Sequence, residues 1–113
     1  GINSGFNHLI RPMFYDSYHK IENLTNAKGA ERIYTVVGNI CETDTFAWDR
    51  KLNEVRENDV LVFRNAGAYG FEMSSNFNSR LKPAEVLFLD GKAHLIRKRD
   101  EFEDLLRNQI EVL

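Results

Sequence analysis

Short runs of apolar and β-branched residues alternate with polar stretches along most of the chain, a pattern typical of β structure. Residues 32–40 contain the run Ile33-Tyr34-Thr35-Val36-Val37 and predict a strand. Residues 18–22 and 60–63 predict two further strands, each bounded by polar residues. Residues 46–53 are ambiguous in their pattern.

The clearest local signal lies in residues 84–96, where Asp90-Gly91 separates two apolar runs. An Asp-Gly pair between apolar runs is characteristic of a β-hairpin. The period then changes, and residues 100–110 predict an amphipathic helix because their apolar residues recur at helical spacing. We expect Asp100 to cap this helix, with Glu103 three residues on completing a capping box.

Together these elements predict a mainly β domain: an antiparallel Greek-key barrel or sandwich with a C-terminal α-helix. The chain has 113 residues, of which 42% are hydrophobic, so residues 1–113 are expected to form a single domain with a core. The chain opens with Gly1 rather than methionine, and residues 1–7 are glycine-rich and polar. We therefore expect it to be part of a longer protein, or a domain on its own.

Charge and cysteine content narrow the classes of partner and compartment. The net charge of −2 gives no electrostatic case for binding nucleic acid or an anionic membrane. No apolar run approaches the roughly 20 residues of a membrane span. The single cysteine cannot form an internal disulfide, which favours a reducing cytoplasm.

That cysteine, Cys41, follows the predicted strand 32–40 and is itself followed by Glu42. Gly38-Asn39 can supply a turn with positive φ between the strand and Cys41. Two interpretations stay open: Cys41 packs as a small hydrophobe, or a loop presents a thiol and a carboxylate for chemistry.

Arginine and tyrosine side chains form the second group of candidates. Arg11 precedes Pro12 and stands four residues before Tyr15. Together, the fork of N–H donors of the arginine and the hydroxyl of the tyrosine can bind one carboxylate. Tyr69 projects from a loop of small residues at 65–70. The alternatives are a solvated arginine and two packed tyrosines. The isolated histidines suggest no metal site, and no phosphate-binding glycine motif or serine–histidine pair is visible.

Four stretches in this order and spacing resemble the C-terminal domain of diaminopimelate decarboxylase, and the resemblance covers essentially the whole chain. The stretches are Gly5–Tyr15 with its Ile10-Arg11-Pro12, Gly38-Asn39-Ile40-Cys41-Glu42-Thr43, residues 65–70, and residues 74–86 with Asn76-Phe77-Asn78-Ser79-Arg80. The family is similar in fold to alanine racemase. It has an N-terminal (β/α)8 barrel that holds pyridoxal 5′-phosphate, followed by a β domain whose first strand comes from before the barrel.

The resemblance implies an activity and residue roles. Family members are homodimers that convert meso-diaminopimelate to L-lysine and carbon dioxide, with each active site at the dimer interface. Arg11 and Tyr15 match the positions that bind the substrate's distal carboxylate. Cys41 matches the general acid, which acts across the interface, and Glu42 matches the residue that reads the distal amino group. Tyr69 matches the tyrosine that contacts cofactor phosphate and substrate.

The chain departs from the family pattern in two ways. The family usually has Cys-Glu-Ser-Gly-Asp, whereas Asp44 here stands three places after Cys41, so the resemblance assigns Asp44 no role. The lysine that forms the Schiff base in a Tyr-Ala-Val-Lys context is also absent from this chain. The resemblance therefore implies that the chain alone is inactive and that the missing barrel holds the cofactor.

Two alternatives remain open. The first is a decarboxylase of the same family acting on ornithine, arginine or a carboxylated polyamine; Arg11 argues against it, because a substrate without a distal carboxylate gives this guanidinium nothing to pair with. The second is a stand-alone β-barrel binding module without catalysis, which an upstream barrel in the gene would exclude.

Overall fold

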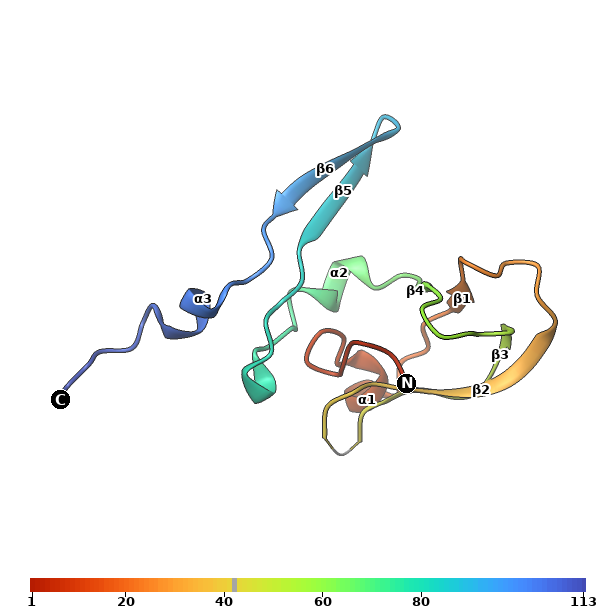
Figure 1. Cartoon of the computed structure of the whole chain (residues 1–113), viewed down its shortest axis with the longest axis horizontal. Helices are drawn as coiled ribbons and strands as arrows, with labels where there is room; N and C mark the ends of the chain where they lie inside the picture. Colours follow the sequence, from red (N-terminus) through yellow and green to blue (C-terminus); the bar gives the residue numbers. More distant parts are fainter. Residues whose placement is uncertain (42) are drawn as a thin grey trace.

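The computed structural model describes residues 1–41 and 43–113, and it confirms that the chain is mainly β, with a few short helices (Figure 1). In this described part, six strands pair antiparallel, two by two, in three separate sheets. They form no closed barrel, because each sheet stops after two strands. The pairs are β1 (Ile21–Asn23) with β4 (Leu61–Phe63), β2 (Glu31–Val37) with β3 (Thr45–Asn53), and β5 (Glu85–Leu89) with β6 (Lys92–Arg97).

The β2–β3 ribbon is the longest paired unit and corrects the strand predictions in two places. The strand predicted over residues 32–40 ends at Val37, and the ambiguous residues 46–53 form β3. The register shifts between Tyr34 and Val36, a bulge-like irregularity that bends and twists a strand. The first sheet also differs from expectation, because β1 takes only the end of the strand predicted over residues 18–22.

A small hydrophobic core lies under the β2–β3 ribbon. The Phe46 and Phe63 rings meet edge to face, with centroids 5.1 Å apart, and so join β3 to β4. Aromatic pairs in this geometry stabilise a core beyond the area that they bury. The core and the residues around it all come from residues 2–66: buried Leu9, Ile21, Val36, Phe46, Ala47 and Leu52, surrounded by partly buried Ile2, Met13, Tyr34, Val55, Leu61, Phe63 and Ala66.

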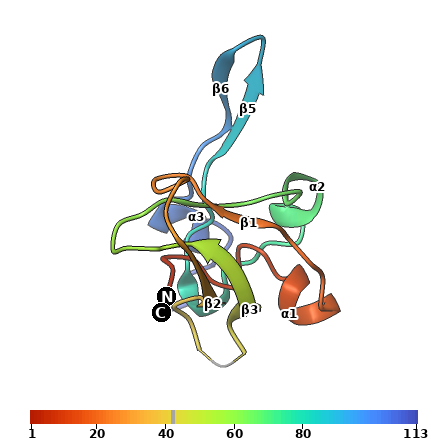
Figure 2. The same ribbon diagram turned by 90° about the vertical axis from the view of Figure 1, so that its right-hand side faces the viewer.

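The predicted hairpin is confirmed and projects away from the rest of the molecule (Figures 1 and 2). Asp90 and Gly91 lie between β5 and β6 with φ angles of 51° and 73°, as a two-residue type I′ turn requires. Apolar side chains of both strands are exposed, among them Val86, Phe88 and Ile96. A two-stranded hairpin exposed on both faces is marginally stable alone, so this one needs a surface to pack against.

The helices are short, and the C-terminal one differs from its prediction. Helix α3 covers Phe102–Leu106 rather than residues 100–110. Glu101 and Asp104 form its capping box, in place of the predicted Asp100 and Glu103. The apolar face of this segment is exposed, so no packing extends a helix that is marginal in water at such a length.

Three other short helical segments position the candidate residues. Helix α1 (Arg11–Tyr15) has Pro12 in its first turn, where a missing N–H costs nothing, and Asp16 ends it in the left-handed conformation. Helix α2 (Gly67–Gly70) replaces part of the predicted loop 65–70. A 3₁₀ segment, η1 (Phe77–Ser79), lies in the fourth motif stretch. Among all the described residues, no helix is long and apolar enough to cross a membrane.

Asp100 has a different role from the predicted helix cap, because it anchors the base of the hairpin. Its carboxylate accepts hydrogen bonds from the Lys82 backbone N–H at 3.0 Å and from the Asn76 amide at 3.1 Å. Its own N–H donates to the Lys82 carbonyl. The Lys82 N–H, followed by the Asn76 amide, lowers the pKa of Asp100 below its ordinary value.

We predict that Asp100→Asn lowers the free energy of unfolding by about 0.5–1.5 kcal/mol at pH 7, the usual net contribution of a hydrogen bond. A lowered folded-state pKa contributes stability above the unfolded pKa of about 3.9, and this is lost as the pH falls through the folded value. The difference between wild type and variant should therefore shrink towards about pH 2. Urea denaturation at both pH values measures it, with exposed Asp49→Asn as the control. A pH-independent difference would contradict the assignment.

Candidate functional site

Contacts between distant segments bring the four motif stretches together. The Asn39 N–H donates to the carbonyl of Ser4 at 3.0 Å, which joins the second stretch to the residue directly before the first stretch. The fourth stretch joins the first through three hydrogen bonds: the Asn7 amide donates to the Ser75 carbonyl, the Ser75 N–H donates to the Asn7 carbonyl, and His8 Nε2 donates to the Leu81 carbonyl. The structure thus brings together segments that are up to 73 positions apart in sequence.

The loop between β2 and β3, which carries Cys41, is organised by the buried carboxylate of Asp44. This carboxylate accepts from the Phe6 backbone N–H at 2.7 Å and from the Ile40 backbone N–H at 3.0 Å. The Gly38 N–H donates to the Asp44 carbonyl at 2.7 Å and closes the base of the loop. Asp44, which had no assigned role, therefore fixes the loop and ties it to the N-terminal segment.

Gly38 is needed for close packing rather than for the predicted positive φ. Gly38 does not have a positive φ, whereas Thr43 in the same loop is left-handed, with φ 62°. A methyl group on Gly38 would lie 2.5 Å from Asp44 Cγ and 2.6 Å from the Ser4 carbonyl oxygen. The glycine therefore lets a carboxylate and a backbone segment approach the end of β2.

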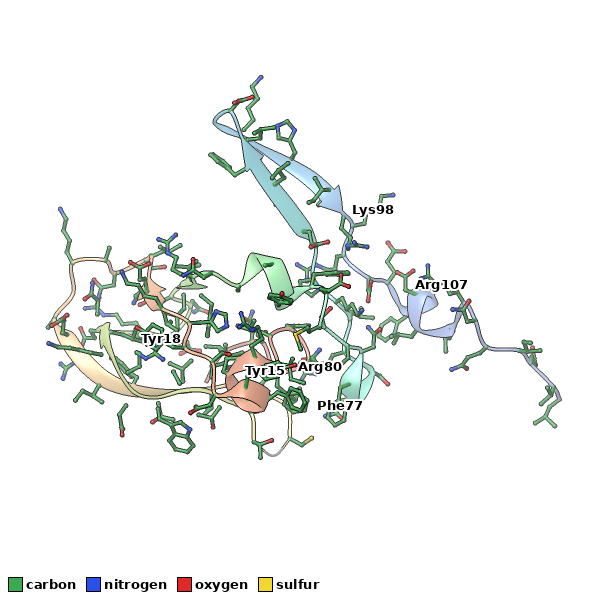
Figure 3. All side chains as sticks on the ribbon, turned by 180° about the vertical axis from the view of Figure 1, so that it is seen from behind. Tyr15, Tyr18, Phe77, Arg80, Lys98 and Arg107 are labelled. Atoms are coloured by element: carbon green, nitrogen blue, oxygen red, sulfur yellow. The ribbon has the colours of Figure 1, made fainter. Side chains whose placement is uncertain are left out.

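Cys41 is exposed, so the interpretation that it packs as a buried hydrophobe is wrong. The Asn78 amide, in η1, donates to Cys41 Sγ at 3.4 Å. Arg80 donates from its guanidinium to the Asn39 carbonyl at 3.0 Å (Figure 3). The fourth motif stretch therefore contacts both the thiol and the backbone of the loop that presents it.

Arg11 and Tyr69 form the second part of the site. The Arg11 guanidinium carbon lies 5.2 Å from the centroid of the Tyr69 ring, a cation–π contact between α1 and α2. Tyr69 is 53% exposed, so it is not packed away, and its ring limits the positions open to the guanidinium. Stacking of this kind leaves the fork of N–H donors in the guanidinium plane free for a carboxylate.

The structure brings some of the predicted residues together and leaves others apart. Tyr15 is exposed, and its ring meets Phe14 edge to face at 4.7 Å. Among the described side chains, the Arg11–Tyr69 pair and the Cys41–Asn78 pair have no recorded contact with each other. Glu42 lies outside the described residues. A ligand would have to span the two pairs to contact both.

Sequence reasoning missed Asp44, Asn78 and Arg80 as site residues. The signal for the last two was present, since both lie in a motif stretch that carries the resemblance without having an assigned role. Asp44 carried a weaker signal, because its spacing from Cys41 departs from the family pattern. Only the fold shows that its two acceptor bonds link residues 6 and 40.

Histidines and acidic residues offer no metal centre in the described part of the chain. His19 is buried, and its Nδ1 donates to the Arg64 carbonyl at 3.0 Å. His8 bridges Ser4 and the Leu81 carbonyl. Both rings therefore hold segments together.

The geometry defines a β domain whose joined segments carry a thiol, an arginine and a tyrosine. A family described as "Pyridoxal-dependent decarboxylase, C-terminal sheet domain" matches residues 1–67. The chain therefore belongs to this family, and the matched part contains the whole hydrophobic core.

Individual relatives give a consistent result. The chain is 50% identical over 112 residues to the diaminopimelate decarboxylase of Methanothermobacter thermautotrophicus, covering 96% of this chain and 26% of that protein. A diaminopimelate decarboxylase from M. jannaschii, solved in complex with L-lysine, superposes with a TM-score of 0.89 at 35% identity, covering 98% of this chain and 26% of the other. The Helicobacter pylori enzyme with L-lysine gives 0.83 at 38% identity, over 93% and 26%. The chain thus spans about a quarter of the length of these relatives.

We predict that Gly38→Ala lowers the free energy of unfolding by about 1–3 kcal/mol, since an added methyl group in a packed site must displace backbone or carboxylate. Urea denaturation of the chain measures this change. Gly67→Ala is the matched control, because a methyl group there meets nothing within 4 Å. Equal stability of the two variants would show that the Asp44 carboxylate does not pack against Gly38 as described.

Proposed function

We propose that this chain is the C-terminal domain of a diaminopimelate decarboxylase, which converts meso-diaminopimelate to L-lysine and carbon dioxide. The observation that carries this proposal is the convergence of the four motif stretches, with Arg11 stacked on Tyr69 and Cys41 exposed on the neighbouring loop. The names of the relatives and their complexes with L-lysine support the choice of substrate class.

In the proposed mechanism, Arg11 binds the distal carboxylate of the substrate. Its guanidinium can donate two parallel N–H bonds to one carboxylate, and the Tyr69 ring holds it in place. The Tyr15 hydroxyl is exposed and available as a further donor. The sequence resemblance alone assigns to Glu42 the binding of the distal ammonium group of the substrate. A substrate without a distal carboxylate would leave Arg11 unpaired, which disfavours ornithine, arginine and polyamines.

Cys41 is proposed as the general acid. Its thiol can deliver a proton from Sγ to the substrate carbon that has lost carbon dioxide, which leaves a thiolate on the loop fixed by Asp44. Because this loop is exposed, the proton can reach a substrate held by another subunit. A reducing cytoplasm, as predicted from the single cysteine, would keep this thiol available.

Pyridoxal 5′-phosphate would supply the electron sink for the reaction when bound. This chain fits part of its site, since the exposed Tyr69 hydroxyl can donate to a phosphate oxygen. Several lysines are engaged elsewhere and do not suit covalent attachment of the cofactor. Lys20 and Lys51 pair with Glu22 and Glu31, and Lys82 lies over the Phe71 ring. We therefore assign covalent attachment of the cofactor to an N-terminal barrel domain.

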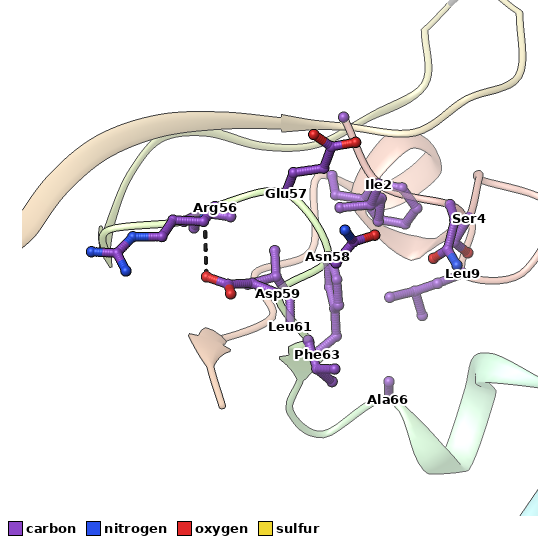
Figure 4. Close-up of a pocket in the computed structure, with 15 residues that line it drawn as sticks. Ile2, Ser4, Leu9, Arg56, Glu57, Asn58, Asp59, Leu61, Phe63 and Ala66 are labelled. Atoms are coloured by element: carbon purple, nitrogen blue, oxygen red, sulfur yellow. Dashed lines mark hydrogen bonds between the residues drawn. The ribbon is translucent and has the colours of Figure 1, made fainter. Parts of the chain in front are cut away.

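A groove of about 710 Å³ supports the finer fold proposal, a Greek-key barrel closed by a strand from before the N-terminal barrel (Figure 4). It lies between the segment 1–4 and β4, and β4 pairs only with β1 among the described strands. An added strand would bury apolar surface there and satisfy the free edge of β4. The apolar side chains that line the groove include Ile2, Leu9, Phe46, Val55, Leu61 and Phe63.

We predict that Arg11→Ala in the full-length enzyme lowers kcat/KM for meso-diaminopimelate. The loss of transition-state stabilisation should be about 2–5 kcal/mol, because the substitution removes one partner of a desolvated charge pair. Steady-state measurement of carbon dioxide release gives this value. Arg32→Ala is the matched control, since Arg32 is exposed, lies at the far end of β2 and pairs with Glu54. An unchanged kcat/KM in Arg11→Ala would remove Arg11 from the site.

We further propose that the full-length enzyme is a homodimer, the commonest closed symmetry, and that the β5–β6 hairpin contributes to its interface. Val86, Phe88, Leu95 and Ile96 are each about half or more exposed, a patch that would favour association. Phe88→Glu should therefore weaken the dimer, as sedimentation over a range of concentrations would show.

Leu24→Glu is the control for the dimer experiment, since Leu24 is also exposed but lies on the loop between β1 and β2. Its dimer affinity should match that of the wild type. A full-length enzyme that stays monomeric at every concentration would overturn the dimer proposal. Equal weakening by both substitutions would remove the hairpin from the interface.

A further inference from the structure

Asn78 is the only side chain in the described part of the molecule with a recorded hydrogen bond to the Cys41 sulfur. Its backbone has φ 59° and ψ 30°, in the left-handed region, where asparagine is among the few tolerated side chains. This conformation lies within η1, between Phe77 and Ser79. The amide Nδ2 donates to Sγ at 3.4 Å, so a strained turn presents a donor to the proposed acid.

Neighbouring contacts fix this turn against the Cys41 loop. Arg80 donates to the Asn39 carbonyl at 3.0 Å, two residues before Cys41. The Phe77 ring packs on Phe6, with centroids 5.1 Å apart, and the Phe6 N–H is one of the two donors to Asp44. The Asn76 amide spans the turn to the Arg80 carbonyl at 2.8 Å. The Asn78 amide is therefore held in place by the same contacts that fix the loop.

We propose that Asn78 stabilises the thiolate that forms on Cys41 during proton delivery, an inference that rests on the proposed function. The proton leaves Sγ for the substrate carbon and the electron pair stays on sulfur, which later regains a proton from solvent. An N–H donor already aimed at the sulfur meets the negative charge as it develops. Hydrogen bonds to charged acceptors are stronger than those to neutral ones, so the bond strengthens along the reaction.

This proposal differs from a purely structural role of the turn in its kinetic signature. An interaction that strengthens only as charge develops affects kcat and leaves KM unchanged. A turn that merely shapes the substrate site would change KM. Loss of a hydrogen bond of this kind corresponds to a decrease in kcat of about tenfold.

The test uses the full-length enzyme with two variants of Asn78. Asn78→Gly keeps the left-handed backbone and removes the amide, whereas Asn78→Asp keeps the side-chain size, removes the donor and adds a repelling charge. We expect kcat for meso-diaminopimelate to fall about tenfold in the glycine variant and further in the aspartate variant, with KM unchanged. Ser79→Gly is the matched control, because Ser79 shares the turn and has φ 56°. It should keep the wild-type kcat.

A second readout does not depend on activity. The rate at which iodoacetamide alkylates Cys41 can be followed by mass spectrometry of the tryptic peptide 33–50, which contains this cysteine. The thiolate is the reacting species, so removal of its donor should slow alkylation in both Asn78 variants and not in Ser79→Gly. Unchanged alkylation, or a loss of activity confined to KM, would overturn the role of Asn78.

Cys41→Ala separates failure of this inference from failure of the proposed function. Full activity in Cys41→Ala would show that Cys41 is not the acid, and the inference would fall with it. Slow turnover in Cys41→Ala together with wild-type kcat in both Asn78 variants would leave the proposed function standing and refute the inference alone.

Discussion

The candidate site depends on the buried carboxylate of Asp44. Its two acceptor bonds come from residues 34 positions apart, Phe6 and Ile40, and its approach requires a glycine at position 38. An unpaired carboxylate in this position would be costly, so the bonds, the loop and the N-terminal segment form as one unit. Cys41 occupies the exposed turn of that unit, and the carboxylate determines where its thiol lies.

The chain is divided between a part that contains the hydrophobic core and a part that is held to it mainly by hydrogen bonds. The core lies entirely within residues 1–66, and the family match ends at residue 67. Later segments reach this part through polar contacts such as Asn7 with Ser75 and His8 with Leu81, and through the packing of Phe77 on Phe6. The hydrogen bonds among these contacts are directional, so they help to fix the positions of Asn78 and Arg80 although they bury little surface.

Features set by neighbouring residues could be predicted from the sequence, whereas those set by distant contacts could not. The Asp90-Gly91 hairpin and the strand before Cys41 follow from turn chemistry and β-branched residues. The C-terminal helix was overestimated because its apolar period implied a packing surface that the described chain does not supply. The resemblance predicted Arg11, Cys41 and Tyr69 as candidate site residues, but the role of Asp44 required the position of Phe6, which no local pattern contains.

Under the proposed function, the exposure of the site gives a physical reason why this domain would act only together with the rest of an enzyme. In water, a guanidinium and a carboxylate attract each other weakly, and a surface ion pair contributes about 0–1 kcal/mol. Arg11 here is stacked on Tyr69 but remains accessible, and Cys41 is exposed as well. Covering the site would remove water from Arg11 and Cys41. It would strengthen both the binding of a substrate carboxylate by Arg11 and the hydrogen bond from Asn78 to the sulfur. The domain therefore prepares the orientation of these groups, and a covering subunit would supply the low dielectric in which that orientation becomes effective.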